Sequence, residues 1–175
     1  MSTAQGFAVW LTGLPASGKS SITRELAKRL HELRVPVVVL ESDGLRNILT
    51  PDATYSPEER DRFYRAMAQL GEVITRNCVN VIFDATANRL AYRDYARTLI
   101  PKFVEIYVRC PLEICMKRDP KGIYERARSG TAATVPGLQS AYEQPIAPEI
   151  TLDCEDRVEA AVDIIIGKLK RLTYL

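Results

Sequence analysis

Residues 13–20 read Gly13-Leu14-Pro15-Ala16-Ser17-Gly18-Lys19-Ser20, which matches the pattern G-x-x-x-x-G-K-[S/T]. This stretch follows the apolar run 7–11 and opens a segment, 19–34, in which apolar residues recur at helical spacing. The alternative is a glycine-rich turn without a ligand. That alternative is weaker, because such a match arises by chance in well under ~1% of chains of this length. The stretch therefore predicts a phosphate-binding loop between a strand and a helix.

The residue types of this loop explain its chemistry. Glycines let the backbone approach phosphate oxygens, so that N–H groups and the positive end of the helix face the anion. Lys19 adds a positive charge near the β and γ phosphates, and Ser20 supplies a hydroxyl for Mg²⁺. We predict that residues 13–20 bind ATP, that Lys19 is catalytic and that Ser20 is a metal ligand.

Short apolar runs alternate with helical patterns along the rest of the chain. The predicted strands are 7–11, 35–40, 79–83, 104–108 and 149–152. The predicted helices are 19–34, 57–77, 90–99 and 156–172, with a further short helix after Pro111. Segment 129–148 is rich in proline, glycine and small residues and is predicted to be a loop. This order predicts a single α/β domain over residues 1–175, with three α/β/α layers and a mainly parallel five-stranded sheet.

Composition restricts the partners of the protein. The 175 residues are 46% hydrophobic and 26% charged, as in an ordinary folded domain. Lys and Arg total 24 against 22 Asp and Glu, so the charge gives no reason to expect nucleic acid. Residues 1–10 lack a basic leader, and no apolar run reaches the ~18 residues of a membrane span. We expect a cytoplasmic protein with no membrane partner.

Cysteine and histidine usage argues against two kinds of site. The four cysteines include no C-x-x-C pair, and His31 is the single histidine, which makes a Cys/His zinc site improbable. We expect the cysteines to be buried small side chains in a reducing compartment. Ser-His-Asp or Cys-His catalysis would depend on His31, which we place on the surface near the end of a helix.

Acidic residues follow the second and third predicted strands, where ligands gather in sheets of this class. Asp43 can orient metal-bound water or accept a hydroxyl proton, while Arg46 can bind an acidic substrate. Asp84 occupies the place of a metal-orienting acid. The alternatives are that Asp43 caps the following helix and that Asp84 is a cap or a structural acid.

A series of arginines, Arg60, Arg62 and Arg65, lies in the predicted helix 57–77. The span from Arg60 to Arg65 covers about 1.4 turns at ~3.6 residues per turn, so these side chains do not share one tight face. A solvated helix face is therefore the alternative to a substrate-binding role.

Beyond the phosphate loop, four segments of the chain resemble the motifs of a known protein family. They are Asp43 with Arg46, the run 56–60 (S-P-E-E-R), the run 118–124 (R-D-P-K-G-I-Y), and Gly137 with the run 142–145 (Y-E-Q-P). Together with the phosphate loop, they resemble the small P-loop kinases, and most closely the adenylylsulfate kinase family. The resemblance extends from Gly13 to Asp153, and the last two segments are specific.

The resemblance implies a P-loop kinase that transfers the γ-phosphate of ATP to the ribose 3′-hydroxyl of adenylylsulfate. By this resemblance Asp43 is the base or the metal-orienting acid, and Arg46 and Arg60 bind substrate. Arg118 lies over the ATP adenine, and Lys121 stands at the base of a mobile lid formed by residues 129–148. The implied ligands are ATP, Mg²⁺ and small nucleotides.

Three departures from the family pattern concern the nucleotide substrate. Ala87, within the run 84–89 (D-A-T-A-N-R), stands where the family has a phosphorylatable serine, so no phosphoserine can form there. Phe63 replaces an asparagine, and Val135 replaces the lid phenylalanine that stacks on the substrate adenine. Both positions are expected to contact substrate.

These departures leave two other functions open. One is a P-loop kinase acting on another small hydroxyl-bearing or acidic metabolite, because the run 84–89 is similar to that of broader kinases. The other is a nucleotide-binding protein without catalysis, against which Lys19, Ser20 and Asp43 argue. The sequence does not determine the oligomeric state, and a homodimer is one option.

Overall fold

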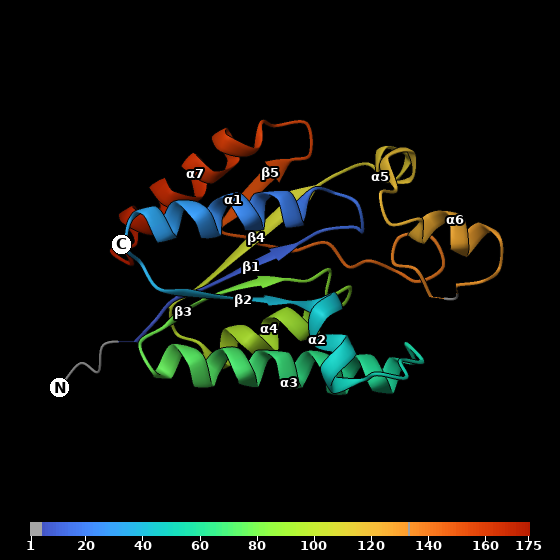
Figure 1. Cartoon of the computed structure of the whole chain (residues 1–175), viewed down its shortest axis with the longest axis horizontal. Coiled ribbons are helices and arrows are strands. Elements are labelled where there is room, and N and C mark those ends of the chain that lie inside the picture. Colours follow the sequence, from blue (N-terminus) through green and yellow to red (C-terminus); the bar gives the residue numbers. More distant parts are fainter. Residues whose placement is uncertain (1–4, 133) are drawn as a thin grey trace.

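The computed structural model describes residues 5–132 and 134–175 (Figure 1). Residues 1–4 and 133, which fall within the predicted domain and lid, lie outside the described residues. In chain order the elements are β1 (Ala8–Thr12), α1 (Lys19–Glu32), β2 (Val37–Glu41), α2 (Ser42–Leu49), α3 (Pro57–Arg76), β3 (Asn80–Asp84), α4 (Leu90–Leu99), β4 (Phe103–Arg109), α5 (Leu112–Arg118), α6 (Ile123–Arg128), β5 (Ile150–Asp153) and α7 (Val158–Arg171).

The five strands form one sheet in the order β2-β3-β1-β4-β5, and every pairing is parallel. Helices α1 and α7 cover one face, while α3 and α4 cover the other (Figure 1). The predicted three-layer α/β/α fold is therefore confirmed. Each connection between parallel strands carries at least one helix, because a parallel pair needs a crossover.

Strand β1 lies at the centre of the sheet and is buried at every residue. Its side chains alternate between the faces, so Val9 and Leu11 belong to the cluster under α1 and α7. Ala8 and Trp10 face α3 and α4, and the Trp10 ring stacks on Phe83 with centroids 4.4 Å apart. Two apolar cores thus fix β1, and with it the start of the phosphate loop.

Strand register places the acidic residues at one edge of the sheet. Asp84 pairs with Leu11 of β1 on one side and with Glu41 of β2 on the other. Because the strands run in the same direction, the loop after β1 and the start of α2, which directly follows β2, emerge beside Asp84. The site is assembled at this carboxyl edge.

Several sequence predictions need correction. Asp84 is the last residue of β3 and does not follow it. Helix α2 begins at Ser42 with Glu41 in the capping position, so Asp43 lies in its first turn and does not cap it. Helix α6 was not predicted, because its six residues are too few to show a period. Cys78 is exposed, whereas Cys110 and Cys115 are buried as expected.

Two other predictions, on His31 and on the loop, agree with the structure. His31 is exposed in the last turn of α1. Residues 129–132 and 134–148 have irregular structure, with an isolated bridge between Pro136 and Ser140. Over the described ranges 5–132 and 134–175, every helix is too short or too polar to cross a lipid bilayer.

Candidate active site

The phosphate loop has a backbone that only glycine allows at two positions. A Cβ on Gly13 would lie 2.5 Å from the carbonyl oxygen of Val108 on the neighbouring strand β4. Gly18 has a φ of 105° and occupies the N-cap position of α1. These two residues bring the loop close to the sheet and turn its end into the helix N-terminus, where an anion is stabilised.

Lys19 folds back over this loop. Its Nζ donates to the carbonyl oxygens of Leu14, at 2.8 Å, and Gly13, at 3.1 Å, and only 7% of the residue is exposed. Burial lowers the pKa of Lys19, against the opposing charge of Asp84. The ammonium is held by neutral carbonyls, so its charge is available to a phosphate group.

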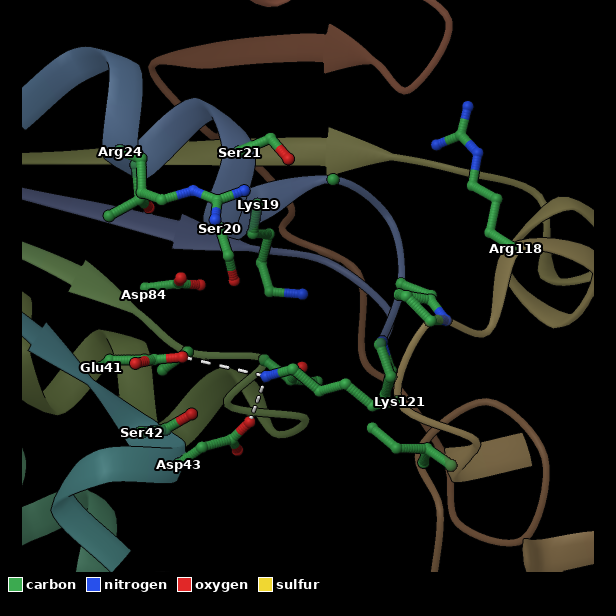
Figure 2. Close-up of a pocket in the computed structure, with 18 of the residues that line it drawn as sticks. Lys19, Ser20, Ser21, Arg24, Glu41, Ser42, Asp43, Asp84, Arg118 and Lys121 are labelled. Carbon is green, nitrogen blue, oxygen red and sulfur yellow. Dashed lines mark hydrogen bonds and ion pairs between the residues drawn. The ribbon is translucent and has the colours of Figure 1, made fainter. Parts of the chain in front are cut away.

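A pocket of about 660 Å³ opens beside the loop. Its walls come from the phosphate loop, the ends of β2 and β3, and the α5–α6 turn, and include Lys19, Ser20, Glu41, Asp43, Asp84, Arg118 and Lys121. Figure 2 shows Lys121 extending across the pocket toward two carboxylates. Its Nζ lies 2.7 Å from Oδ2 of Asp43 and 3.8 Å from Oε1 of Glu41.

The two side chains predicted as metal ligands, Ser20 and Asp84, both line this pocket, as Figure 2 shows. Asp84 is buried at the sheet edge and Ser20 is exposed in the first turn of α1. Hydroxyl and carboxylate oxygens are donors that suit Mg²⁺. Within the described ranges, no group of three or more His, Cys, Asp or Glu side chains could hold a metal ion by itself.

Arg118 ends helix α5 on the opposite wall of the pocket (Figure 2). Its Nη2 donates to the carbonyl oxygen of Cys154, which follows β5, at 2.9 Å. This contact fixes a planar, exposed guanidinium at the pocket wall. Guanidinium planes stack readily on aromatic rings, and the contact of Arg118 with a nucleobase stays a prediction.

Arg46, predicted to bind substrate, is almost fully buried. Its Nη1 lies 3.3 Å from Oε1 of Glu59, and its guanidinium carbon lies 4.0 Å from the centre of the Phe63 ring. Phe63 is itself buried in the core under α3 and α4. Sequence reasoning missed Glu59, although its place in the run 56–60 put it inside a segment already singled out.

Arg60 reaches the segment predicted to be the lid. Its Nη2 donates to the carbonyl oxygen of Thr134 at 2.9 Å and to Thr134 Oγ1 at 3.1 Å. The neighbouring Val135 is buried against α5 and α6, in a cluster separate from Phe63. Arg65 instead pairs with Asp61 on the exposed face of α3, as the solvated-face alternative expects.

Two tyrosines, which sequence reasoning did not single out as site residues, join the outer segments to the end of β1 and to the phosphate loop. The Tyr142 hydroxyl lies 3.0 Å from Thr12 Oγ1, which donates to the Thr86 carbonyl oxygen. The Tyr124 hydroxyl donates to the carbonyl oxygen of Pro15 at 3.0 Å. Burial raises the pKa of both phenols, so they stay protonated and able to donate. Tyr124 lies in the run 118–124 and Tyr142 in the run 142–145. These two family-like segments were the sequence signal that could have identified both tyrosines.

The buried side chain of Arg93 holds the loop after β3 in place through hydrogen bonds. It donates from Nε to Glu105 at 2.7 Å, from Nη2 to the Glu143 carbonyl oxygen at 2.7 Å, and from Nη1 to the Ala87 carbonyl oxygen. One side chain thus joins β4, the loop carrying Ala87 and the C-terminal part of the predicted lid. No short motif pointed to this residue, because its partners are far apart in the sequence.

Comparison with known proteins agrees with this geometry. The sequence profile of the family described as adenylylsulphate kinase matches residues 5–153. A probable adenylyl-sulfate kinase of Archaeoglobus fulgidus is 39% identical over 149 residues, which cover 85% of this chain and 96% of that protein. An adenylyl-sulfate kinase of Gloeothece citriformis is 37% identical over 172 residues, covering 98% of each chain.

A solved structure is also similar. The Mycobacterium tuberculosis APS kinase CysC, determined in complex with AMPPNP and APS, superposes with a TM-score of 0.89 at 29% identity, over 95% of this chain and 98% of that one. The sequence profile matches residues 5–153, which is most of the chain. The chain belongs to the adenylylsulphate kinase family.

Proposed function

We propose that this protein transfers the γ-phosphate of ATP to the 3′-hydroxyl of adenylylsulfate. The observation that carries the proposal is that one pocket joins the phosphate loop, with Lys19, to the carboxylate of Asp43, which Lys121 contacts from the opposite wall. Phosphoryl transfer needs a cradle for the donor and a group that positions the acceptor hydroxyl. Membership of the family supports adenylylsulfate as the acceptor.

In this proposal the phosphate loop binds the triphosphate and Lys19 stabilises the charge that develops on the γ-phosphate. Arg118 holds the adenine of ATP at the outer wall. Asp43 accepts the proton of the acceptor hydroxyl as the new O–P bond forms. The bond to the β,γ-bridging oxygen breaks, and ADP leaves with that electron pair.

Ser20 and Asp84 would hold Mg²⁺ in this proposal. When bound, the cation neutralises charge on the β and γ phosphates. Ser20 would supply a hydroxyl ligand, and the buried carboxylate of Asp84 would orient the water molecules bound to the ion. Two protein oxygens are enough, because Mg²⁺ keeps most of its ligands as water and phosphate oxygens.

The acceptor would occupy the end of the site between α2, α3 and residues 129–148. Arg46, Arg60 and Lys121 would supply positive charge to this end, and Phe63 and Val135, which lie in separate apolar clusters, would supply apolar packing. Segment 129–148 would act as the lid, because Arg60 already contacts it at Thr134. Lid closure would exclude water from the γ-phosphate.

Release of ADP in the presence of ATP and Mg²⁺ tests the proposal, with adenylylsulfate compared against a panel of hydroxyl-bearing and acidic metabolites. Stimulation by adenylylsulfate, with the phosphate on the 3′-oxygen of the product, supports it. Stimulation by another hydroxyl compound would replace it with a kinase of different acceptor. Binding of ATP without turnover would point to a protein that only binds nucleotides.

Small nucleotides are the partners in this proposal, and neither nucleic acid nor a membrane takes part. The cytoplasmic location stays a prediction, and a homodimer stays one option. Light scattering on the purified protein measures the oligomeric state directly.

A further inference from the structure

Glu59 is a buried acid that accepts four hydrogen bonds where α2 and α3 meet. It lies in the first turn of α3 and is 7% exposed. Its carboxylate accepts from Thr54 N–H at 2.6 Å, Thr54 Oγ1 at 2.7 Å and Tyr55 N–H at 3.3 Å. It also accepts from Arg46 Nη1 at 3.3 Å. One side chain therefore joins α2, α3 and the loop between them.

The contacts of Arg46 depend on this carboxylate. Its guanidinium carbon lies 4.0 Å from the centre of the Phe63 ring and 4.8 Å from that of Tyr55. Two aromatic faces stabilise the cation but do not decide which way its N–H groups point. The bond to Glu59 sets that direction, because a charged pair is the stronger and more directional contact.

Tyr55 occupies a strained position in the same cluster. Its φ is 56°, which is uncommon for a residue with a side chain, and the bonds from Thr54 and Tyr55 to Glu59 hold it there. The residue is 42% exposed and lies near both arginines, since the guanidinium carbon of Arg60 is 5.5 Å from the centre of its ring. Arg60 Nε also donates to the Tyr55 carbonyl oxygen at 3.2 Å.

We infer that Glu59 is a positioning residue for the acceptor substrate, which orients Arg46 directly and Arg60 through the backbone of Tyr55. This inference rests on the proposed function, because it concerns the acceptor end of that site. Glu59 itself is buried beneath these groups and acts through them. Its carboxylate keeps two cations and one aromatic ring in a fixed arrangement before an anionic acceptor arrives, which lowers the ordering cost of binding.

A purely local role in the helix does not account for these contacts. Ser56 already caps α3, because its Oγ accepts from the Glu59 N–H at 3.1 Å. Glu58 also supplies negative charge in the same first turn, and its side chain is exposed. Glu59 differs from Glu58 in being buried and in reaching across to Arg46. Glu58→Gln is therefore a matched control.

The test is the Glu59→Gln variant of the full chain, which keeps the shape and an acceptor oxygen for Thr54 but loses the charge. We expect the KM for adenylylsulfate to rise tenfold or more, with the KM for ATP within twofold of the wild-type value. Glu58→Gln should change neither KM. Equal changes in both KM values, or no change in either, would overturn the inference.

A double-mutant cycle with Arg46→Met separates positioning from loss of structure. Because Glu59 acts mainly through Arg46, the rise in KM for adenylylsulfate in the double variant should be clearly smaller than the product of the two single rises, and the remaining effect reports the route through Arg60. Additive effects on the KM would contradict the inference even if every variant folds. If the metabolite panel identifies a different acceptor, the proposed function fails, and the same KM comparison with that acceptor still tests Glu59.

Discussion

The Nζ of Lys121 lies 2.7 Å from Oδ2 of Asp43, a contact between residues 78 positions apart. It connects the turn between α5 and α6 to the first turn of α2 across the phosphate pocket (Figure 2). The hydrogen bond that Lys121 donates to Asp43 raises the pKa of Lys121, against partial burial, so the lysine stays charged. The proposed proton acceptor is thus held by a cation on a separate part of the chain.

This pair predicts that Lys121 matters for activity and little for stability. Both side chains are more than half exposed, and exposed ion pairs contribute about 0–1 kcal/mol. We expect Lys121→Met to lower kcat/KM for the acceptor by about tenfold or more, because Asp43 loses the group that orients it. The melting temperature should change little. Exposed Lys117, in the preceding helix, gives the control Lys117→Met, and equal losses in both variants would contradict the prediction.

Lys19→Ala removes the cation of the phosphate loop. We expect kcat to fall by ~10² or more, because the lost interaction strengthens as charge develops on the γ-phosphate. Circular dichroism and thermal unfolding should show that the fold survives. Unchanged turnover in a folded variant would exclude the proposed role of Lys19.

Asp43 and Asp84 are predicted to divide the chemistry between them. Asp43→Asn should depress kcat with little change in ATP affinity, because it removes the proton acceptor. Asp84→Asn should raise the Mg²⁺ concentration needed for half-maximal rate. Metal titrations of the two variants measure this difference. A wild-type Mg²⁺ response of Asp84→Asn would leave Asp84 as a structural acid.

Segment 129–148 is predicted to gain protection when both substrates bind. Its described part has few regular backbone bonds and contacts α3 through Arg60 and Thr134. Hydrogen exchange of the full chain, with and without adenylylsulfate and a non-hydrolysable ATP analogue, measures this. Equal exchange in both conditions would argue against a lid.

Low pH is predicted to weaken another group of ion pairs, in which Arg97 contacts Glu105 and Glu149. Burial opposes ionisation of Glu149, but bonds from Arg97 at 2.6 Å and from the Glu105 N–H at 2.6 Å outweigh it and lower its pKa below the ordinary 4.5. A carboxyl whose pKa is lower in the folded state stabilises above the unfolded value, and this contribution is lost as pH falls through the folded value.

Glu149→Gln should therefore cost ~1–2 kcal/mol of unfolding free energy at pH 7, in keeping with bonds to a charged group. The difference from wild type should shrink below pH 4.5. Urea titrations across this range measure both. A difference independent of pH would show that ionisation of Glu149 contributes nothing.

Short-range patterns in the sequence are enough to predict the phosphate loop, the alternation of strands and helices, and the family. They consist of glycines and a lysine at fixed spacing, apolar residues at periods of 2 and 3.6, and segments such as 118–124 and 142–145. Local rules also place the acids near strand ends. Asp43 and Asp84 are therefore evident from the amino-acid sequence alone.

The tertiary fold, by contrast, decides the burial, the orientation and the contacts of the predicted side chains. The sequence predicts that Arg46 binds substrate, but only the fold packs its guanidinium on Phe63 and orients it by the pair with Glu59. Lys121 meets Asp43, and Arg93 ties Ala87 to Glu143, through contacts that span tens of residues. Such pairings depend on which strands are neighbours and in what register, and that follows from the packing of two apolar cores against the whole sheet, which no local pattern contains.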